Sequence, residues 1–142
     1  MTAKQYLDQI RNYERRIERI NEEIERLEAV ATNTSPSLTG MPHNPSPTTS
    51  RLEEAVCKIL DKEAELRQER ARLDEVLKTA TLIISSIEQE NYRDVLRKRY
   101  LLSEIWEDIA AEMYVSLHYV YKLHNRALKE FEKYLKEDTK GY

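Results

Sequence analysis

The chain has 142 residues, of which 35% are charged and 8% are aromatic, with 2 Gly and 4 Pro. This composition lacks the turn residues that a protein of many short strands requires, so long helices are expected. The formal net charge of -3 gives no overall basic excess, so nucleic-acid binding would require locally clustered basic residues. Cys57 is the only cysteine, which excludes an internal disulfide and fits a reducing cytoplasm.

No segment approaches the ~20 consecutive apolar residues that a helix needs to cross a bilayer. The N-terminal residues also lack the uninterrupted apolar core of a signal peptide. We therefore expect a cytoplasmic protein with no membrane partner.

The first segment has a seven-residue repeat of apolar positions. Its spacings alternate between four and three residues, which predicts a long helix that keeps one seam against a partner helix. The seam consists of Tyr6, Ile10, Tyr13, Ile17, Ile20, Ile24 and Leu27.

Residues 31–50 interrupt this pattern. They contain all four prolines, one of the two glycines and no charged residue. Proline lacks the backbone N–H and biases the preceding residue away from helical geometry, so the sequence predicts a flexible Pro/Ser/Thr-rich loop here.

The repeat continues after the loop, to residue 87. Two polar residues, Glu63 and Arg70, interrupt it, and polar groups in such a seam usually cost stability while fixing register. The positions are Leu52, Val56, Ile59, Glu63, Leu66, Arg70, Leu73, Leu77, Ala80, Ile84 and Ile87.

The two long helices should fold back as an antiparallel, coiled-coil-like hairpin over residues 1–87. The second helix would overhang the first by about 12 Å, which leaves the apolar residues 81–87 in need of a cover. Either the C-terminal segment or another subunit could supply it. Because a lone two-helix hairpin buries little surface, we expect this arm to form a homo-oligomer.

Over residues 88–142, the spacing of apolar residues predicts a module of three shorter helices. The stretch 106–128 fits a helix-turn-helix, with Ala110 where the two helices cross and Ser116 as the cap of the last helix. The apolar residues that would fill the angle between the helices are Ile109, Met113, Val115, Val120 and Leu123. The sequence thus predicts an all-α fold, with a hairpin followed by a helix-turn-helix domain.

Two positions depart from the usual pattern of this motif. Tyr114 stands where the turn often has a left-handed glycine, which would cost about 1–2 kcal/mol, so we expect a wider turn. Ile105 occupies the natural cap position of the first motif helix, and Ser103 could cap it one step early.

The stretch from Tyr92 to Phe131, YRDVLRKRYLLSEIWEDIAAEMYVSLHYVYKLHNRALKEF, resembles region four of bacterial sigma factors, which reads promoter elements. A helical N-terminal part, a Pro-rich loop and this motif together resemble the small phage and prophage regulators of the RinA and ArpU kind. The resemblance implies control of phage late genes and leaves RNA polymerase open as a partner. Leu117 and His118 depart from the charged residues that sigma factors usually carry there.

The last motif helix has the features of a recognition helix. Between Ser116 and Lys129 it carries three basic residues and no acid, and its early outward positions would meet base edges in the major groove of double-stranded DNA. Lys122 and Asn125 are assigned to base edges and Leu117 to a thymine methyl group. Base or phosphate contacts are assigned to His118, Tyr121 and Arg126, with Lys129 in the same basic cluster.

The helix before the motif offers a second group of basic residues. If it packs across the DNA backbone, its basic residues would bind flanking phosphates. These residues are Arg93, Arg97, Lys98 and Arg99.

No catalytic constellation, metal site or cofactor motif is present, so we expect no enzyme, no bound metal and no cofactor. His118 and His124 fall on different helix faces, and Trp106 is interpreted as a core anchor.

The leading functional hypothesis is therefore a sequence-specific transcriptional regulator of phage or prophage genes. One alternative is a DNA-packaging recognition protein similar to phage small terminase subunits, and a second is a coiled-coil adaptor that binds protein.

Overall fold

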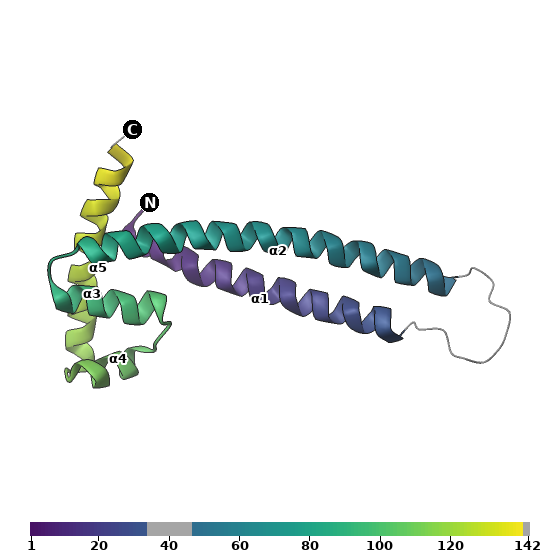
Figure 1. Ribbon diagram of the computed structural model, residues 1–142. Coiled ribbons are helices and arrows are strands. Elements are labelled where there is room, and N and C mark those ends of the chain that lie inside the picture. The colour runs from purple at the N-terminus through teal and green to yellow at the C-terminus, as the bar shows by residue number, and fades with distance from the viewer. Residues whose placement is uncertain (34–46, 141–142) are drawn as a thin grey trace. The chain divides into compact units, whose positions relative to one another are not determined.

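The computed structural model describes residues 1–33 and 47–140, and within these residues the chain is helical, with no strand (Figure 1). The all-α class expected from the sequence is thereby confirmed. The elements in chain order are α1 (Ala3–Asn33), α2 (Pro47–Ser86), α3 (Glu90–Leu96), the π-helical turn η1 (Arg97–Leu101), α4 (Trp106–Met113) and α5 (Leu117–Lys140).

The two long helices extend further than expected. The prediction of a loop over residues 31–50 was wrong at both ends, because α1 continues to Asn33 and α2 already begins at Pro47. Proline is tolerated in the first helical turn, where a backbone N–H has no partner in any case. In the last turn of α1, the Thr32 hydroxyl donates to the carbonyl of Glu28 at 2.8 Å. The rest of the predicted loop lies outside the described residues.

Tertiary contacts divide the chain into two compact units. One unit comprises residues 13–72, and the other comprises residues 1–12 together with residues 73–142. This division differs from the boundary predicted at residue 87, because the first turns of α1 and the last turns of α2 belong with the C-terminal helices.

In the unit of residues 13–72, α1 and α2 run antiparallel. Arg16 pairs with Glu69 at 3.8 Å, and Glu23 pairs with Lys62 at 2.8 Å. A step of seven residues towards the C-terminus of α1 thus corresponds to a step of seven residues towards the N-terminus of α2. The apolar contacts between the helices involve Ile17, Ile20, Ile24, Ile59 and Leu66.

The predicted seam on α2 needs a correction at alternate positions. Ala55 is buried whereas Val56 is 44% exposed, and Glu69 is buried whereas Arg70 is exposed. In a straight helix, positions seven residues apart are rotated by about 20° from one another. Two sets of seven-residue-repeat positions, shifted by one residue, are therefore both compatible with the apolar pattern. The chain uses the set that brings Lys62 and Glu69 opposite charged partners on α1.

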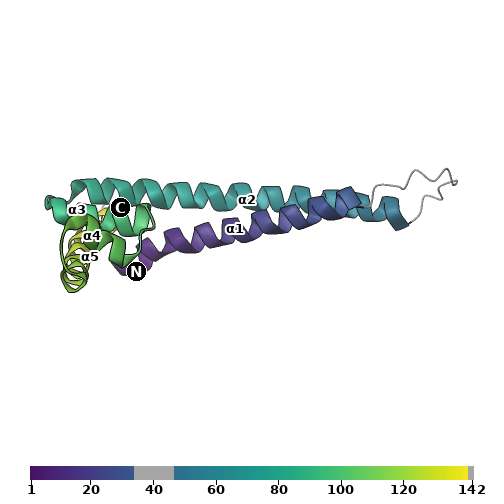
Figure 2. The ribbon, with the colours of Figure 1, turned by 90° about the horizontal axis from the view of Figure 1, so that it is seen from below.

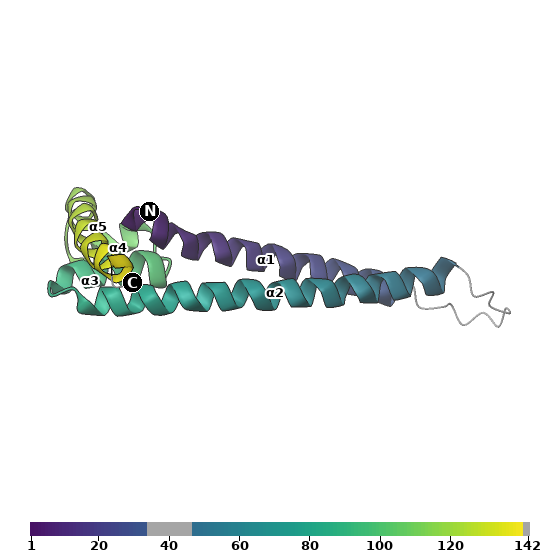
Figure 3. The ribbon, with the colours of Figure 1, turned by 90° about the horizontal axis from the view of Figure 1, so that it is seen from above.

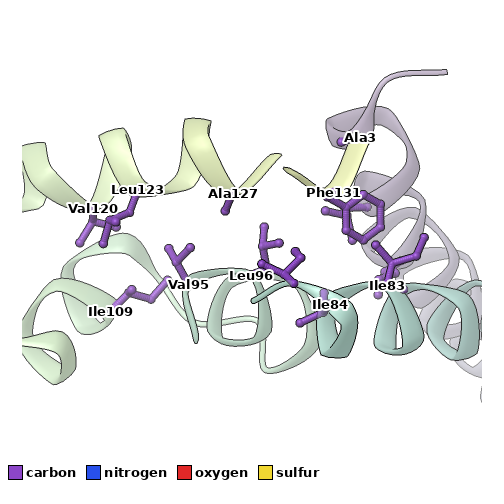
Figure 4. Packing of buried hydrophobic residues seen from close by; sticks show 14 of the residues in the cluster. Ala3, Ile83, Ile84, Val95, Leu96, Ile109, Val120, Leu123, Ala127 and Phe131 are labelled. Carbon is purple, nitrogen blue, oxygen red and sulfur yellow. The ribbon is translucent and has the colours of Figure 1, made fainter. Parts of the chain in front are cut away.

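The other unit has one core made by all five α-helices. Figure 2 and Figure 3 show α3, α4 and α5 gathered beside the first turns of α1 and the last turns of α2. The buried side chains of α5 face those of α2, α3 and α4 (Figure 4). The fully buried large side chains are Leu7, Ile10, Ile84, Ile87, Val95, Leu96, Ile109, Val120 and Phe131.

The isoleucines of the apolar run at residues 81–87 are covered by this unit, whereas Leu82 is 62% exposed. Ile83, Ile84 and Ile87 are buried in the same cluster as Leu96 and Phe131. Of the two covers expected from the sequence, the C-terminal segment is the one observed, and the first turn of α1 also joins the cluster through Ala3.

Candidate nucleic-acid interface

A tight turn joins α4 to α5, and a left-handed residue ends α4. Tyr114 has φ 56° and ψ 41°, and its N–H donates to the carbonyl of Ala111 at 3.3 Å. The N–H of Val115 reaches back to the carbonyl of Ala110 at 3.1 Å. These bonds form a Schellman-type helix end, which usually employs glycine. The expectation of a wider turn was therefore wrong, because the chain accepts the left-handed conformation at a tyrosine.

The two helix starts in this region are capped differently. The Ser116 hydroxyl accepts a hydrogen bond from the N–H of Tyr119 at 3.1 Å, which confirms the predicted cap of α5. Ile105 occupies the cap position of α4 and provides no side-chain hydrogen bond. Ser103 does not act as that cap, because its φ of 56° places it at the end of the preceding helix instead.

The predicted inward and outward faces of α5 match the structure. Val120, Leu123 and Ala127 are buried as expected. The residues of α5 assigned to DNA contact are exposed to solvent, as is Arg97 of η1, although Leu117 at 36% and Tyr121 at 41% are partly covered. The exposed set is Leu117, His118, Tyr121, Lys122, Asn125, Arg126, Lys129 and Arg97.

The cations of α5 fall into two groups. Lys133 pairs with Glu130 at 3.1 Å and Lys136 pairs with Glu132 at 3.8 Å, so these two lysines are compensated within the helix. Within the described part of the chain, the cations between residues 117 and 129 form no ion pair, so their charge is uncompensated. These are Lys122, Arg126 and Lys129.

Most basic residues of α3 and η1 are used internally. Arg93 donates to the carbonyls of Ile87 and Glu88, which closes the connection between α2 and α3. Lys98 pairs with Glu112 on α4 at 2.6 Å. Each of these two cations therefore already has a structural partner, and phosphate binding by either stays a prediction.

Arg99 is also held inside the unit. Its guanidinium lies over the Trp106 ring at 4.4 Å and donates to the carbonyl of Glu104 at 3.0 Å. Arg97 is exposed and forms no ion pair with any described residue, so it is the one member of the predicted phosphate group that keeps a free cation.

Beneath the outer face of α5 lies a cluster of aromatic rings around His124. The Tyr100 hydroxyl is 2.7 Å from Nε2 of His124, and Trp106 stands edge-on to the His124 ring at 4.6 Å. Tyr121 also stands edge-on to Trp106, with the ring centres 5.4 Å apart. The cluster therefore connects η1, α4 and α5 on the inner side of α5.

Burial sets the ionisation of this cluster. It lowers the pKa of His124 to about 4, and the nearby positive charge of Arg99 acts in the same direction. Burial also raises the pKa of Tyr100 to about 12. At neutral pH His124 is thus uncharged, and its Nε2 shares one hydrogen bond with the Tyr100 hydroxyl.

A carboxylate pair lies on the side of α4. Glu104 contacts Glu112, and the pKa of Glu104 is raised, first by burial and then by its hydrogen bond to Glu112. The pKa of Glu112 is lowered, mainly by its hydrogen bond to Lys98. This arrangement holds the end of η1 against α4.

Apart from the inward face of α5, no pattern in the sequence predicts the His124 cluster. Tyr100 and His124 are 24 residues apart, so no helical spacing links them. Trp106 was interpreted as a core anchor and is indeed packed against the main cluster. His124 itself is only 7% exposed.

In residues 1–33 and 47–140, no group of His, Cys, Asp or Glu side chains could hold a metal ion. No helix within these ranges is long and apolar enough to span a bilayer. Comparisons with protein-family models, with curated proteins and with solved structures found no match for this chain.

Proposed function

We propose that this protein is a sequence-specific DNA-binding regulator of phage or prophage transcription, in which α4 and α5 form a helix-turn-helix and α5 enters the major groove. The observation that carries the proposal is the stripe of uncompensated cations on the exposed face of α5 between residues 117 and 129. Among the residues that the structure describes, Lys122, Arg126 and Lys129 have no acidic partner, whereas Lys133 and Lys136 further along the helix do.

The surroundings of this stripe support the same role. The first turn of α5 follows a tight turn and is capped by Ser116, so its free N–H groups and positive dipole end lie at one end of the basic stripe. Val120, Leu123 and Phe131 anchor the opposite face in the core. A recognition helix needs this combination of a rigid inner face and an outer face of polar and basic side chains.

The proposed role is binding rather than catalysis. Asn125 lies on the outer face with Lys122, and an asparagine can bond the edge of an adenine with both polar atoms. A good bidentate contact of this kind discriminates against the wrong base by about 1–3 kcal/mol, or roughly 5-fold to 150-fold in affinity. Lys122 and Arg126 would add phosphate or guanine contacts.

The test begins with selection of bound sequences from a random pool of short duplexes. The affinity of the selected duplex is then measured across a range of salt concentrations for the unaltered protein and for Lys122→Ala, Arg126→Ala and Lys133→Ala. A lost phosphate contact should reduce the slope of log affinity against log salt by about one. Lys133→Ala is the matched control, because Lys133 is already paired with Glu130.

We expect Lys122→Ala and Arg126→Ala to weaken binding and Lys133→Ala to leave it nearly unchanged. Helix content measured by circular dichroism should be equal in all variants, since each side chain is exposed. Equal affinities for all four proteins, or no selected duplex at all, would refute the assignment of α5 as a recognition helix.

A further inference from the structure

The unit of residues 13–72 has a small core for its size. In its described residues, 13–33 and 47–72, the buried apolar side chains are Ile20, Ile24, Ala55 and Leu66. Two long helices joined by so few buried groups gain little hydrophobic stabilisation against the entropy of ordering them. Further apolar burial on this unit therefore requires another surface.

A second seven-residue stripe runs along α2 beside the one that faces α1. Its positions are separated by four, three, four and three residues, so they share one helix face. Val56 is 44% exposed and Leu60 is 58% exposed. The stripe consists of Val56, Leu60, Glu63, Arg67 and Arg70.

The charges of this stripe differ from those next to α1. On the other side of α2, Lys62 pairs with Glu23 and Glu65, and Glu69 pairs with Arg16. Among the described residues, Glu63, Arg67 and Arg70 have no ion-pair partner. An apolar end and an unpaired charged end thus lie along one face of one helix.

The order of the charges favours one partner and one orientation. If two copies of this stripe met in parallel, Glu63 would face Glu63 and Arg67 would face Arg67, which is repulsive at both positions. In an antiparallel pairing, Glu63 of each copy can face Arg67 of the other, and Leu60 can face the aliphatic stem of Arg70. A two-fold contact must be self-complementary, and only the antiparallel arrangement satisfies this requirement.

We propose that the stripe Val56, Leu60, Glu63, Arg67 and Arg70 is the interface of an antiparallel homodimer, formed by α2 of two copies of this chain with Glu63 opposite Arg67. This inference does not rest on DNA binding, because it concerns the unit of residues 13–72 alone. It covers Leu60 with the stem of Arg70 and pairs the charges of Glu63 and Arg67, which have no ion-pair partner among the described residues.

Charge reversal tests the pairing in the full chain. The mass in solution is measured by analytical ultracentrifugation over a range of concentrations. Glu63→Arg places like charges opposite each other twice in each dimer, and so does Arg67→Glu, so each should weaken dimerisation at least 10-fold. The double variant Glu63→Arg/Arg67→Glu should restore it. Leu60→Asp should also weaken it, while Gln68→Asp, an exposed position of α2 outside the stripe, should not.

Cys57 gives an independent measure of orientation, because it is the only cysteine and is exposed. With Glu63 opposite Arg67, Cys57 of one copy lies opposite residue 73 of the other. The two cysteines are then separated by about 24 Å along the helices, at 1.5 Å per residue. Nitroxide labels on Cys57 should show this long separation in pulsed electron resonance.

Three results would overturn the proposal. The first is a monomer at all concentrations up to hundreds of micromolar. The second is an assembly of any size that neither Leu60→Asp nor the single charge reversals weaken. The third is a short separation between the labels or ready formation of a Cys57 disulfide, since neither is compatible with Glu63 opposite Arg67.

Discussion

Replacement of Tyr114 by glycine should stabilise the unit that contains α4 and α5. Tyr114 has φ 56° and ψ 41°, a left-handed conformation that costs a residue with a Cβ atom about 1–2 kcal/mol. Glycine removes this cost but loses about 0.5–1 kcal/mol more backbone entropy on folding. The tyrosine side chain is 94% exposed, so its removal sacrifices almost no burial. The net expectation is a gain of about 0.5–1 kcal/mol.

The assay is urea unfolding followed by the fluorescence of Trp106, the only tryptophan, which lies in the same unit as the turn. Tyr114→Ala is the matched control, because it removes the same side chain but keeps a Cβ atom at the left-handed position. We expect Tyr114→Gly to be more stable than both the unaltered protein and Tyr114→Ala. If glycine and alanine give equal stability, or if glycine destabilises the unit, backbone strain at Tyr114 is refuted.

Three further predictions concern the core behind α5. His124 has a pKa of about 4 in the folded chain, below the ordinary 6.5. The stabilisation from its neutral form is therefore complete above pH 6.5 and is lost as the pH falls towards 4. His124→Gln should flatten this part of the curve of unfolding free energy against pH, and His118→Gln should not. Tyr100→Phe removes the hydrogen-bond partner of buried His124 and should cost about 1–3 kcal/mol in urea unfolding, against nearly zero for Tyr119→Phe. Phe131→Ala should cost about 3–5 kcal/mol, because Phe131 is fully buried, and a loss below 1 kcal/mol would contradict its role as a core anchor.

Periodicity predicted the long helices well and their facing positions only in part. On α1 the predicted seam contains the buried Ile10, Ile20 and Ile24. On α2 the same reasoning favoured Val56 over Ala55, because the larger apolar residue carries the stronger signal. The choice between the two sets of positions depends on which charges meet across the pair, and that is a property of two helices together.

The candidate interface shows a similar division. The outward positions of α5, such as Lys122 and Asn125, follow from a helical period of 3.6 residues, and their exposure agrees with it. The internal contacts of Arg93, Lys98 and Arg99 could not be predicted from the sequence. Their partners lie on another helix or in a connecting segment, and the sequence does not specify how these segments are placed. The His124 cluster was missed for the same reason.

The sequence by itself determined the helical class, the approximate position of each helix, the inner and outer faces of α5 and the Ser116 cap, because these depend on local propensity and on the spacing of apolar residues. The tertiary structure alone decided which segment covers residues 81–87, which cations keep a free charge and how Tyr114 closes a tight turn. Each of these depends on contacts between residues far apart in the chain or on backbone strain that the surrounding packing sustains. Local sequence patterns do not specify these long-range contacts or the packing energy that offsets the strain.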